Sequence, residues 1–471
     1  MQSLSKSSIA SSPRPVKILQ FGNGNFLRGF TDWMIEKSNQ AGAFNGDIHI
    51  VQVHSKSGSN PMKDQDCLFH VIEQGLKKGE LVQESTLVKS VAGITNVFEN
   101  YQEYLELGEN PDLRFIVSNT TEAGIVFDQT DHSADSISKT FPGKLTALLY
   151  HRFKTFDGDA SKGLIFLPCE LIEGNGEALK ECIQKYISFW KLPAEFSEWI
   201  DWKNIFCNTL VDRIVPGFPK GSIEEIQEKI GYKDDMAVMV EPYHFWAIEG
   251  AKTVKEEFPL DKAGLNVKFV DNLAPFRTQK VRILNGGHTS MVPYGYLKGL
   301  RTVREAVESP EIGEFLRKAI FEEIIPTLNM PQDELEQFAN DVLERFANPF
   351  IVHELKSIAL NSISKFKVRV LPSLLAYYEL KKAWPEKLTL SFAALLVFYK
   401  GNYNGVEIPV NDNPTLMAEF NSAWSLGSTK EVVEKLLSER DYWGEDLRSY
   451  EGLVESVTKA VDQLLISSPK P

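Results

Sequence analysis

The sequence contains few of the residues that covalent cross-links or metal centres require. Only four of the 471 residues are cysteines, and their spacing shows neither a CxxC motif nor a pairing pattern. No HExxH or comparable metal-ligand spacing occurs. We therefore expect a reduced, cytoplasmic protein whose chemistry needs no metal ion. The four are Cys67, Cys169, Cys182 and Cys207.

The chain also lacks a basic surplus and a long apolar run. Lys and Arg number 51 against 64 Asp and Glu, which gives a net charge of -13. Because phosphate backbones bind basic faces, we expect no nucleic-acid partner. The longest apolar run, residues 388–399, is too short to span a bilayer. Residues 1–15 are Ser-rich without the apolar core of a signal peptide, and we expect them to be a disordered start.

Length and patterning indicate an α/β protein with more than one domain. A chain of 471 residues exceeds what one hydrophobic core usually organises, and 43% hydrophobic with 24% charged residues is typical of globular proteins. Short apolar runs alternate with helical patterns in the first half, which predicts a doubly wound, mostly parallel sheet. The expected strands are 16–21, 47–53, 114–117 and 164–167.

Helical patterns dominate the second half of the chain. Apolar residues recur at helical spacing in segments such as 312–325, 331–345 and 431–438. We therefore expect a Rossmann-like dinucleotide-binding domain over residues 16–230. A mainly α-helical domain that carries substrate and catalytic residues should occupy residues 231–471.

A glycine-rich turn follows the first expected strand and opens a helix, as a dinucleotide fingerprint requires. Gly22 permits the tight turn, and Gly24 lets the backbone approach a pyrophosphate at the helix N-terminus. Leu27 occupies the place of the usual third glycine, with Gly29 two residues later. A tight turn without ligand is the alternative. The expected cofactor contacts are Ile18, Leu19, Gln20, Phe21, Gly22, Asn23, Gly24, Asn25, Phe26, Leu27, Arg28 and Gly29.

Two further segments bear on the cofactor. The second strand ends without the acid that usually binds the adenosine ribose, and Ser55 and Lys56 there can receive a 2′-phosphate, so the residues leave NAD and NADP open. A polar loop after the third strand either faces the nicotinamide ribose or caps the next helix. Its candidate cofactor contacts are Ser118, Asn119, Thr120 and Glu122.

The segment K-V-R-I-L-N-G-G-H, residues 280–288, is the strongest catalytic candidate. In a helix over 281–296, Lys280 shares a stripe with Leu284 and His288, and Asn285 lies beside it. Burial of an ammonium and an imidazole on an apolar stripe costs free energy and is typical of catalytic sites. The alternative is a lysine reaching solvent, an asparagine that caps a helix and a core histidine.

These segments together resemble the polyol-specific long-chain dehydrogenase family, also called the mannitol dehydrogenase family. The family pairs a G-x-G-x-F-x-R-G turn, here residues 22–29, with a K-x-x-x-x-N-x-x-H segment, here residues 280–288. The resemblance covers nearly the whole chain. It implies a Rossmann-like domain followed by a helical domain, NAD as cofactor, and a lysine acid/base in Lys280 assisted by Asn285 and His288.

Within the family, the chain resembles most closely the branch that interconverts D-tagaturonate and D-altronate in hexuronate catabolism. Fructuronate and fructose are the alternative substrates that the resemblance leaves open. An asparagine that helps hold the substrate oxyanion in mannitol-oxidising members is replaced here by Leu171. Either Asn285 acts alone in that task or another donor, such as Asn175, replaces it.

A uronate carboxylate needs a cationic partner. The basic cluster after the R-F-A-N-P segment, residues 345–349, offers Lys356, Lys365, Lys367 and Arg369. The resemblance places substrate contacts near Lys356 and Lys365, although both also fit a solvated helix face. A redox-inactive dinucleotide-binding regulator is the alternative of another class, but it would not need Lys280, Asn285 and His288 together. The expected partner is thus a small sugar-acid substrate. Oligomeric state is open, and a monomer is compatible with the family.

Overall fold

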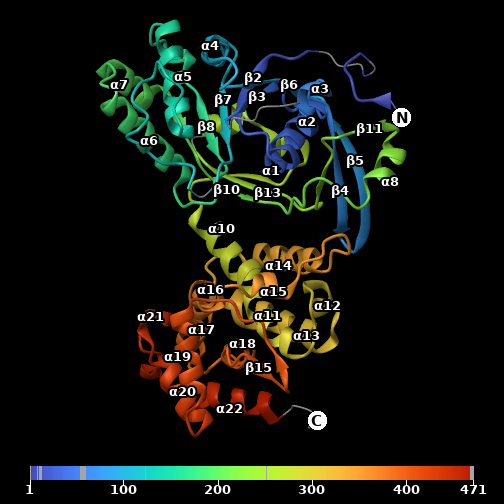
Figure 1. Cartoon of the computed structure of the whole chain (residues 1–471), viewed down its shortest axis with the longest axis vertical. Coiled ribbons are helices and arrows are strands. Elements are labelled where there is room, and N and C mark those ends of the chain that lie inside the picture. Colours follow the sequence, from blue (N-terminus) through green and yellow to red (C-terminus); the bar gives the residue numbers. More distant parts are fainter. Residues whose placement is uncertain are drawn as a thin grey trace. The chain divides into compact units, whose positions relative to one another are not determined.

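The computed structural model describes residues 2–7, 9, 13–53, 60–121, 123–250 and 252–466. The chain divides into two compact units, shown in blue to yellow-green and in yellow to red in Figure 1. The first comprises the chain up to Gly75 together with Leu81–Leu273. The second comprises Leu76–Glu80 and the chain from Ala274 onward.

A six-stranded sheet in which all neighbours are parallel forms the centre of the first unit. The strand order β6-β3-β2-β7-β8-β9 changes direction beside β2, and open α/β sheets bind ligands at such a switch point. The four expected strands are present, and the doubly wound sheet is confirmed. The strands are β2 (Val16–Phe21), β3 (Asp47–Gln52), β6 (Val91–Asn96), β7 (Phe115–Ser118), β8 (Ile165–Pro168) and β9 (Ile205–Phe206).

Both faces of this sheet are buried, which explains why its strands are continuous apolar runs. Successive residues of a strand point to opposite faces. Accordingly, Ile18 belongs to the core cluster that includes residues of α2 (Trp33–Gln40). Its neighbour Leu19 belongs to the opposite cluster, beneath α5 (Phe141–Thr155) and α6 (Asn175–Phe189). Figure 1 shows these helices around the sheet.

The division between the units differs from the expected boundary near residue 231. Strands beyond that position pair with earlier strands of the first unit: β12 with β4, and β13 with β10. Because these strands pair with the first unit, that unit extends to Leu273. A local sequence pattern cannot predict such pairing between separate segments. The strands concerned are β4 (Phe69–Lys77), β5 (Glu80–Val88), β10 (Asn208–Asp212), β12 (Val238–Val240), β13 (Phe245–Glu249) and β14 (Val267–Val270).

The expected disordered start is wrong for part of the segment. Gln2–Ser3 forms strand β1, parallel to β11 (Tyr232–Lys233), and Leu4 is buried. The backbone N–H of Lys6 donates to a carboxylate oxygen of Asp66 at 2.9 Å. A strand that finds its partner more than two hundred residues away gives no local signal.

The second unit is built of helices, as the patterning predicts. Its core helix is α18, whose residues from Leu388 to Phe398 are all buried except Leu390, and which packs against α11 and α22. The apolar run 388–399 is thus a core helix. The principal helices are α10 (Ala274–Gln279), η5 (Lys280–Asn285), α11 (Gly286–Leu297), α13 (Pro310–Lys318), α14 (Gln332–Phe346), α15 (Leu355–Ile358), α16 (Ser362–Arg369), α17 (Leu371–Lys381), α18 (Glu386–Phe398), α19 (Pro414–Trp424), α20 (Thr429–Leu437) and α22 (Leu453–Ile466).

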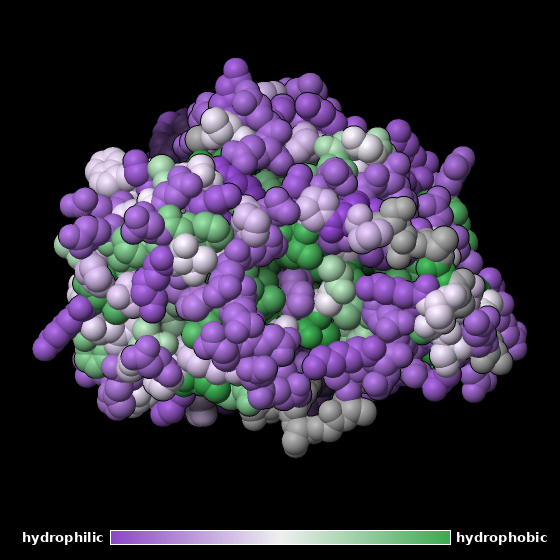
Figure 2. Space-filling view, turned by 90° about the horizontal axis from the view of Figure 1, so that it is seen from above, coloured by the Kyte–Doolittle hydropathy of each residue, from purple (hydrophilic) through white to green (hydrophobic). Residues whose placement is uncertain are grey.

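Among the described residues, no helix has the length and apolar character needed to cross a membrane. Hydrophilic side chains cover most of the face of the molecule shown in Figure 2, with apolar residues in separate patches.

Candidate active site

The glycine turn has the geometry that a dinucleotide requires. Gly22 follows β2 with φ +117°, a conformation that L side chains rarely adopt, and its N–H donates to the carbonyl of Val51 at 3.0 Å. Gly24 precedes the helix with extended backbone, and a Cβ placed on it would meet no atom within 4 Å. The open space beside Gly24 at a helix N-terminus is where a pyrophosphate would fit.

Gly29 performs the packing task of the missing third glycine. A Cβ at this position would lie 2.6 Å from a methyl carbon of Val240 and 3.2 Å from one of Val215. The helix can therefore approach the neighbouring chain only because residue 29 has no side chain. Leu27 is buried in the adjoining core, as its place at the start of the helix allows.

Arg28 stabilises the glycine turn through hydrogen bonds from its side chain, a structural role that the sequence did not predict. Its buried guanidinium donates to the carbonyl of Asn23 at 3.3 Å and to the side-chain oxygen of Asn25 at 2.7 Å. It also donates to the carbonyl of Met236, a residue distant in sequence. Burial lowers the pKa of Arg28 to about 10, so the guanidinium stays charged near neutral pH and can fix the turn.

The loop after β7 is held by a carboxylate. Buried Glu170 accepts hydrogen bonds from the Ser118 hydroxyl at 3.1 Å and from the Thr120 N–H at 2.9 Å. Asn119 donates to the carbonyl of Cys169 at 2.6 Å. Helix α5 begins only at Phe141 and is capped by Thr140, so the capping alternative for this loop is wrong. Cofactor contact by the loop stays a prediction.

Three of the sequence candidates lie outside the described residues: Ser55, Lys56 and Glu122. Leu171, which replaces the family's oxyanion asparagine, is 64% exposed. Asn175 is fully buried, and its amide donates to three backbone carbonyls and accepts from the N–H of Thr209 at 2.8 Å. Asn175 is thus committed to the fold, and the suggestion that it replaces the missing donor is wrong.

The catalytic segment lies in a continuous helical stretch whose winding changes. Lys280 to Asn285 form a π-helix between α10 and α11. In an α-helix, residues five apart point about 140° away from each other. In a π-helix, hydrogen bonds run from i to i+5, so the fifth residue returns nearly to the same face. The winding therefore brings Asn285 towards the face of Lys280, from which a regular α-helix would have turned it away.

Burial agrees with this alignment. Leu284 is buried, whereas Lys280, Asn285 and His288 are half-buried. Asn285 has helical backbone and makes no capping hydrogen bond, so the capping alternative is wrong. Within the part of the chain that the structure describes, no protein group hydrogen-bonds its side chain. Its amide is available to an oxygen of a bound molecule.

His288 is positioned by aromatic packing. Its ring stacks on Phe346 with centroids 3.9 Å apart and meets the edge of His353 at 5.2 Å. Burial lowers the pKa of His353, which favours the neutral form of that ring beside His288. Since His288 follows Asn285 by three residues of α-helix, it lies within about 60° of Asn285 around the helix axis.

The two expected substrate lysines differ in their surroundings. Lys356 is exposed, with 61% of its side chain accessible, and pairs with Glu354 at 3.1 Å. Lys365 lies on α16, is half-buried and donates to the carbonyl of Ile358 at 2.8 Å. Helix α16 packs against both η5 and α11, which brings Lys365 to the helix pair that carries the catalytic residues.

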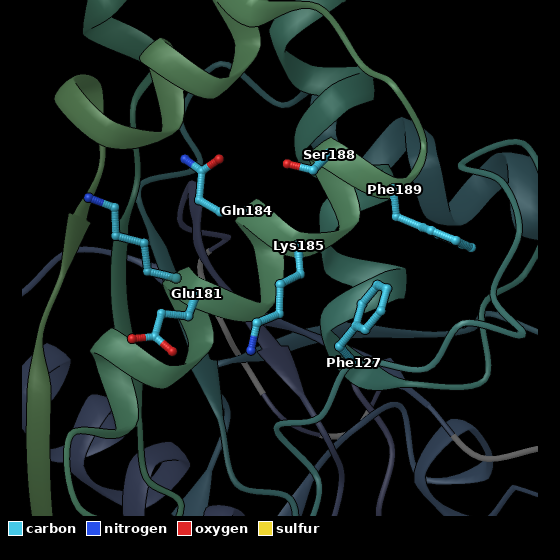
Figure 3. A pocket seen from close by; sticks show the side chains of 7 residues that line it. Phe127, Glu181, Gln184, Lys185, Ser188 and Phe189 are labelled. Atoms are coloured by element: carbon cyan, nitrogen blue, oxygen red, sulfur yellow. The ribbon is translucent and has the colours of Figure 1, made fainter.

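A surface pocket of about 690 Å³ lies elsewhere, along the outer side of α6 in the first unit. Figure 3 shows Glu181, Gln184, Lys185 and Ser188 projecting from this helix, with Phe189 at its end beside Phe127. None of its lining residues is a sequence candidate, and we do not identify it with the active site. The described residues contain no group of three or more His, Cys, Asp or Glu side chains placed to hold a metal ion.

A doubly wound parallel sheet with this glycine turn, followed by a helical unit with a lysine, an asparagine and a histidine on one helix, defines a dinucleotide-dependent dehydrogenase. The chain belongs to the mannitol dehydrogenase family. The mannitol dehydrogenase Rossmann domain matches residues 16–262, and the mannitol dehydrogenase C-terminal domain matches residues 272–465.

Several relatives are similar over nearly their whole length. The altronate oxidoreductase of Bacillus subtilis (strain 168) is 48% identical over 445 residues, covering 94% of this chain and 91% of the relative. That of Phocaeicola vulgatus is 45% identical over 466 residues, covering 98% and 97%. The solved ternary complex of Pseudomonas fluorescens mannitol 2-dehydrogenase with NAD and D-mannitol shares the fold, with TM-score 0.67, 21% identity and coverage of 98% and 97%.

The open space at Gly24 generates a first prediction. Gly24→Val should leave the free energy of unfolding within about 0.5 kcal/mol of wild type, because the side chain meets no protein atom. It should weaken NADH binding roughly 10- to 100-fold, the equivalent of an overpacking cost of about 1–3 kcal/mol. Calorimetric titration with NADH measures this. Gly221→Val, at another open position, is the control; equal NADH affinity in both variants would contradict the assignment.

A second prediction concerns Asp32, which lies four residues after Arg28 in the π-helix η1 (Arg28–Asp32). Its carboxyl group is fully buried, and neither oxygen has a hydrogen-bond partner of normal geometry among the described residues. Burial raises the pKa of Asp32 to about 8, although the charge of Arg28 and the nearby Gln20 side chain oppose the shift. Between about pH 5 and 8 the folded protein therefore keeps a proton on Asp32 that the unfolded chain has lost.

The free energy of unfolding should consequently fall as pH rises, by up to about 1.4 kcal/mol per pH unit relative to Asp32→Asn, and level off above about pH 8. Urea unfolding of the cofactor-free protein from pH 5 to 9 measures the slope. The exposed Asp64→Asn serves as control and should follow wild type. Parallel curves for wild type and Asp32→Asn would show that Asp32 is ionised in the folded protein.

Proposed function

We propose that the protein catalyses the reversible NADH-dependent reduction of D-tagaturonate to D-altronate in hexuronate catabolism. The observation that carries the proposal is that Lys280 and Asn285 share one π-helical segment, in which no described residue hydrogen-bonds the Asn285 amide. The chain in which they occur is 45–48% identical to proteins named altronate oxidoreductase. The glycine turn supports binding of the dinucleotide.

The bound NADH supplies the hydride that adds to the ketone carbon. Negative charge then develops on the ketone oxygen and has to be stabilised and protonated. The side-chain NH2 of Asn285 would donate a hydrogen bond to this oxygen. Lys280 would transfer a proton from its ammonium group to the same oxygen, which gives the alcohol. In the oxidation direction, the neutral amine of Lys280 would accept the proton of the alcohol.

His288 would hydrogen-bond a substrate hydroxyl, because its ring is fixed in orientation by Phe346. Lys365 is better suited than Lys356 to face the substrate carboxylate, since Lys356 is exposed and already paired with Glu354. Lysine and asparagine together meet both electrostatic demands of the reaction, so we expect no dependence on a metal ion.

We also infer a cytoplasmic setting. All four cysteines are buried and free of disulfide bonds, which is compatible with a reducing compartment. The expected partner is the small sugar-acid substrate. No particular oligomeric state is proposed, and a monomer is compatible with the family.

The direct test is NADH and NADPH oxidation with D-tagaturonate, D-fructuronate and D-fructose in parallel, with EDTA present. Rapid NADH oxidation with tagaturonate in EDTA is the expected result. Turnover of another ketone would retain the Lys280 chemistry and change the substrate. If no ketone were reduced while NADH still bound, a redox-inactive regulator would be the better description.

Lys280→Ala should lower kcat by roughly 10²- to 10⁴-fold, the usual contribution of a positioned acid, while NADH affinity stays at the wild-type value. Asn285→Ala should lower kcat by roughly 10²- to 10³-fold through loss of an oxyanion donor. Lys298→Ala is the control, because Lys298 is exposed at the end of the same helical stretch and pairs with Glu311 at 2.7 Å. Wild-type turnover in Lys280→Ala would rule out the mechanism.

A further inference from the structure

Arg369 ends helix α16 and is held against the catalytic helix by its backbone. A Cβ on Gly286 would lie 2.9 Å from the carbonyl oxygen of Arg369, so only a glycine at 286 permits the approach. Gly286 directly follows Asn285. The glycine pair of the catalytic segment thus places a specific arginine next to the predicted oxyanion donor.

The side chain of Arg369 reaches along the same helix. Its Nη1 donates to the hydroxyl of Thr289 at 3.5 Å, and Thr289 directly follows His288. The backbone and the side chain of Arg369 therefore contact positions 286 and 289, which are adjacent to Asn285 and His288. This arginine lies beside two of the three predicted catalytic residues through contacts within the second unit alone.

The charge of the Arg369 guanidinium is not neutralised by any acidic side chain that the structure describes. The side chain is half-buried, and no carboxylate within the described ranges forms an ion pair with it. Burial lowers the pKa of Arg369, with no acidic group to offset the effect. Removing a guanidinium from water without an opposite charge costs free energy, and a bound carboxylate would recover it.

Lys365 adds a second positive charge one turn earlier on α16. Burial lowers the pKa of Lys365, and the charge of Arg369 lowers it further, against an opposing effect of Asp412. The two cations are thus near enough to repel each other. An anion placed between them would relieve this repulsion, and the planar guanidinium fork matches the two oxygens of a carboxylate.

We propose that Arg369 binds the carboxylate of the substrate and is the residue that selects a sugar acid over a neutral ketose. This inference rests on the proposed function, which assigns a uronate substrate. The sequence placed Arg369 in a basic cluster with three lysines, but no motif or spacing singled it out from them. Its assignment comes from its contacts with residues about eighty positions earlier in the chain.

The test compares Arg369→Met with Lys367→Met in the full-length protein. Lys367 lies two residues earlier on α16 and therefore points about 200° away, and its side chain runs beside Gly444. Each variant removes one positive charge from the same helix. KM and kcat are measured with NADH for D-tagaturonate and for D-fructose, and D-altronate binding in the presence of NAD is measured by calorimetry.

In Arg369→Met, KM for tagaturonate should rise and altronate affinity should fall roughly 10- to 100-fold, as expected for lost hydrogen bonds to a charged group. Turnover of fructose and kcat for tagaturonate should change less than about threefold. Lys367→Met should follow wild type. Arg369→Lys keeps the charge but loses the fork, so its KM should lie between those of Arg369→Met and wild type even if the methionine variant folds poorly.

The remaining outcomes separate the two proposals. Unchanged KM and altronate affinity in both Arg369 variants, with tagaturonate still reduced by wild type, would overturn the role of Arg369 and leave the proposed function intact. An equal loss of kcat on tagaturonate and fructose would also overturn it, because Arg369 would then only position the helix. A wild-type protein that reduced fructose but no uronate would overturn both.

Discussion

The contact between Gly286 and the backbone of Arg369 determines how the second unit presents its chemistry. With 2.9 Å between a hypothetical Cβ and the carbonyl oxygen, no other residue fits at 286 without displacing α16. This close packing fixes the helical stretch that carries Lys280, Asn285 and His288. Gly287 is less restricted, because a Cβ there would lie 3.3 Å from a side-chain carbon of Ile320 and 3.6 Å from one of Leu316. The two glycines weaken an isolated helix, and tertiary packing compensates for that weakness.

The π-helical winding of residues 280–285 also decides where the catalytic side chains point. Five residues of α-helix would point Lys280 and Asn285 apart, whereas the π-helix between them turns both to one face. A similar π-helix, η1, follows the glycine turn in the first unit and carries Arg28 and Asp32. In both places, irregular helical winding coincides with a predicted ligand site. The spacing of residues in the sequence acquires its meaning only through this local geometry.

Buried charge is the other theme common to both units. Arg28 is buried beneath the glycine turn, where backbone carbonyls and the Asn25 amide satisfy it. Glu170 is buried beneath the loop after β7, where it accepts hydrogen bonds from that loop. Both charges are satisfied by protein groups and stabilise loops near the switch point of the sheet. Arg369 differs, since the Thr289 hydroxyl is a hydrogen-bond partner without charge and no acid in the described part of the chain pairs with the guanidinium, which is the basis for the proposed binding role.

The sequence by itself determined the features that depend on neighbouring residues. Apolar runs such as 16–21 predicted the parallel strands, because both faces of a parallel sheet are buried. The glycine turn and the segment at 280–288 were recognisable because their chemistry needs fixed spacing. Helical periodicity likewise predicted the second unit, although not the residue at which it begins.

Only the tertiary structure decided the features that join distant segments. The first unit extends to Leu273 because β12 and β13 pair with strands formed much earlier in the chain. In the sequence, Asn175 was a candidate for binding the substrate. In the fold, its side-chain amide donates hydrogen bonds to three backbone carbonyls instead. The sequence offered Arg369 only as one of four basic residues, and its contacts with Gly286 and Thr289 are what distinguish it from the others. The local pattern of apolar residues predicts which face of a helix or strand is buried. Which segments pack against that face depends on contacts between residues far apart in the sequence.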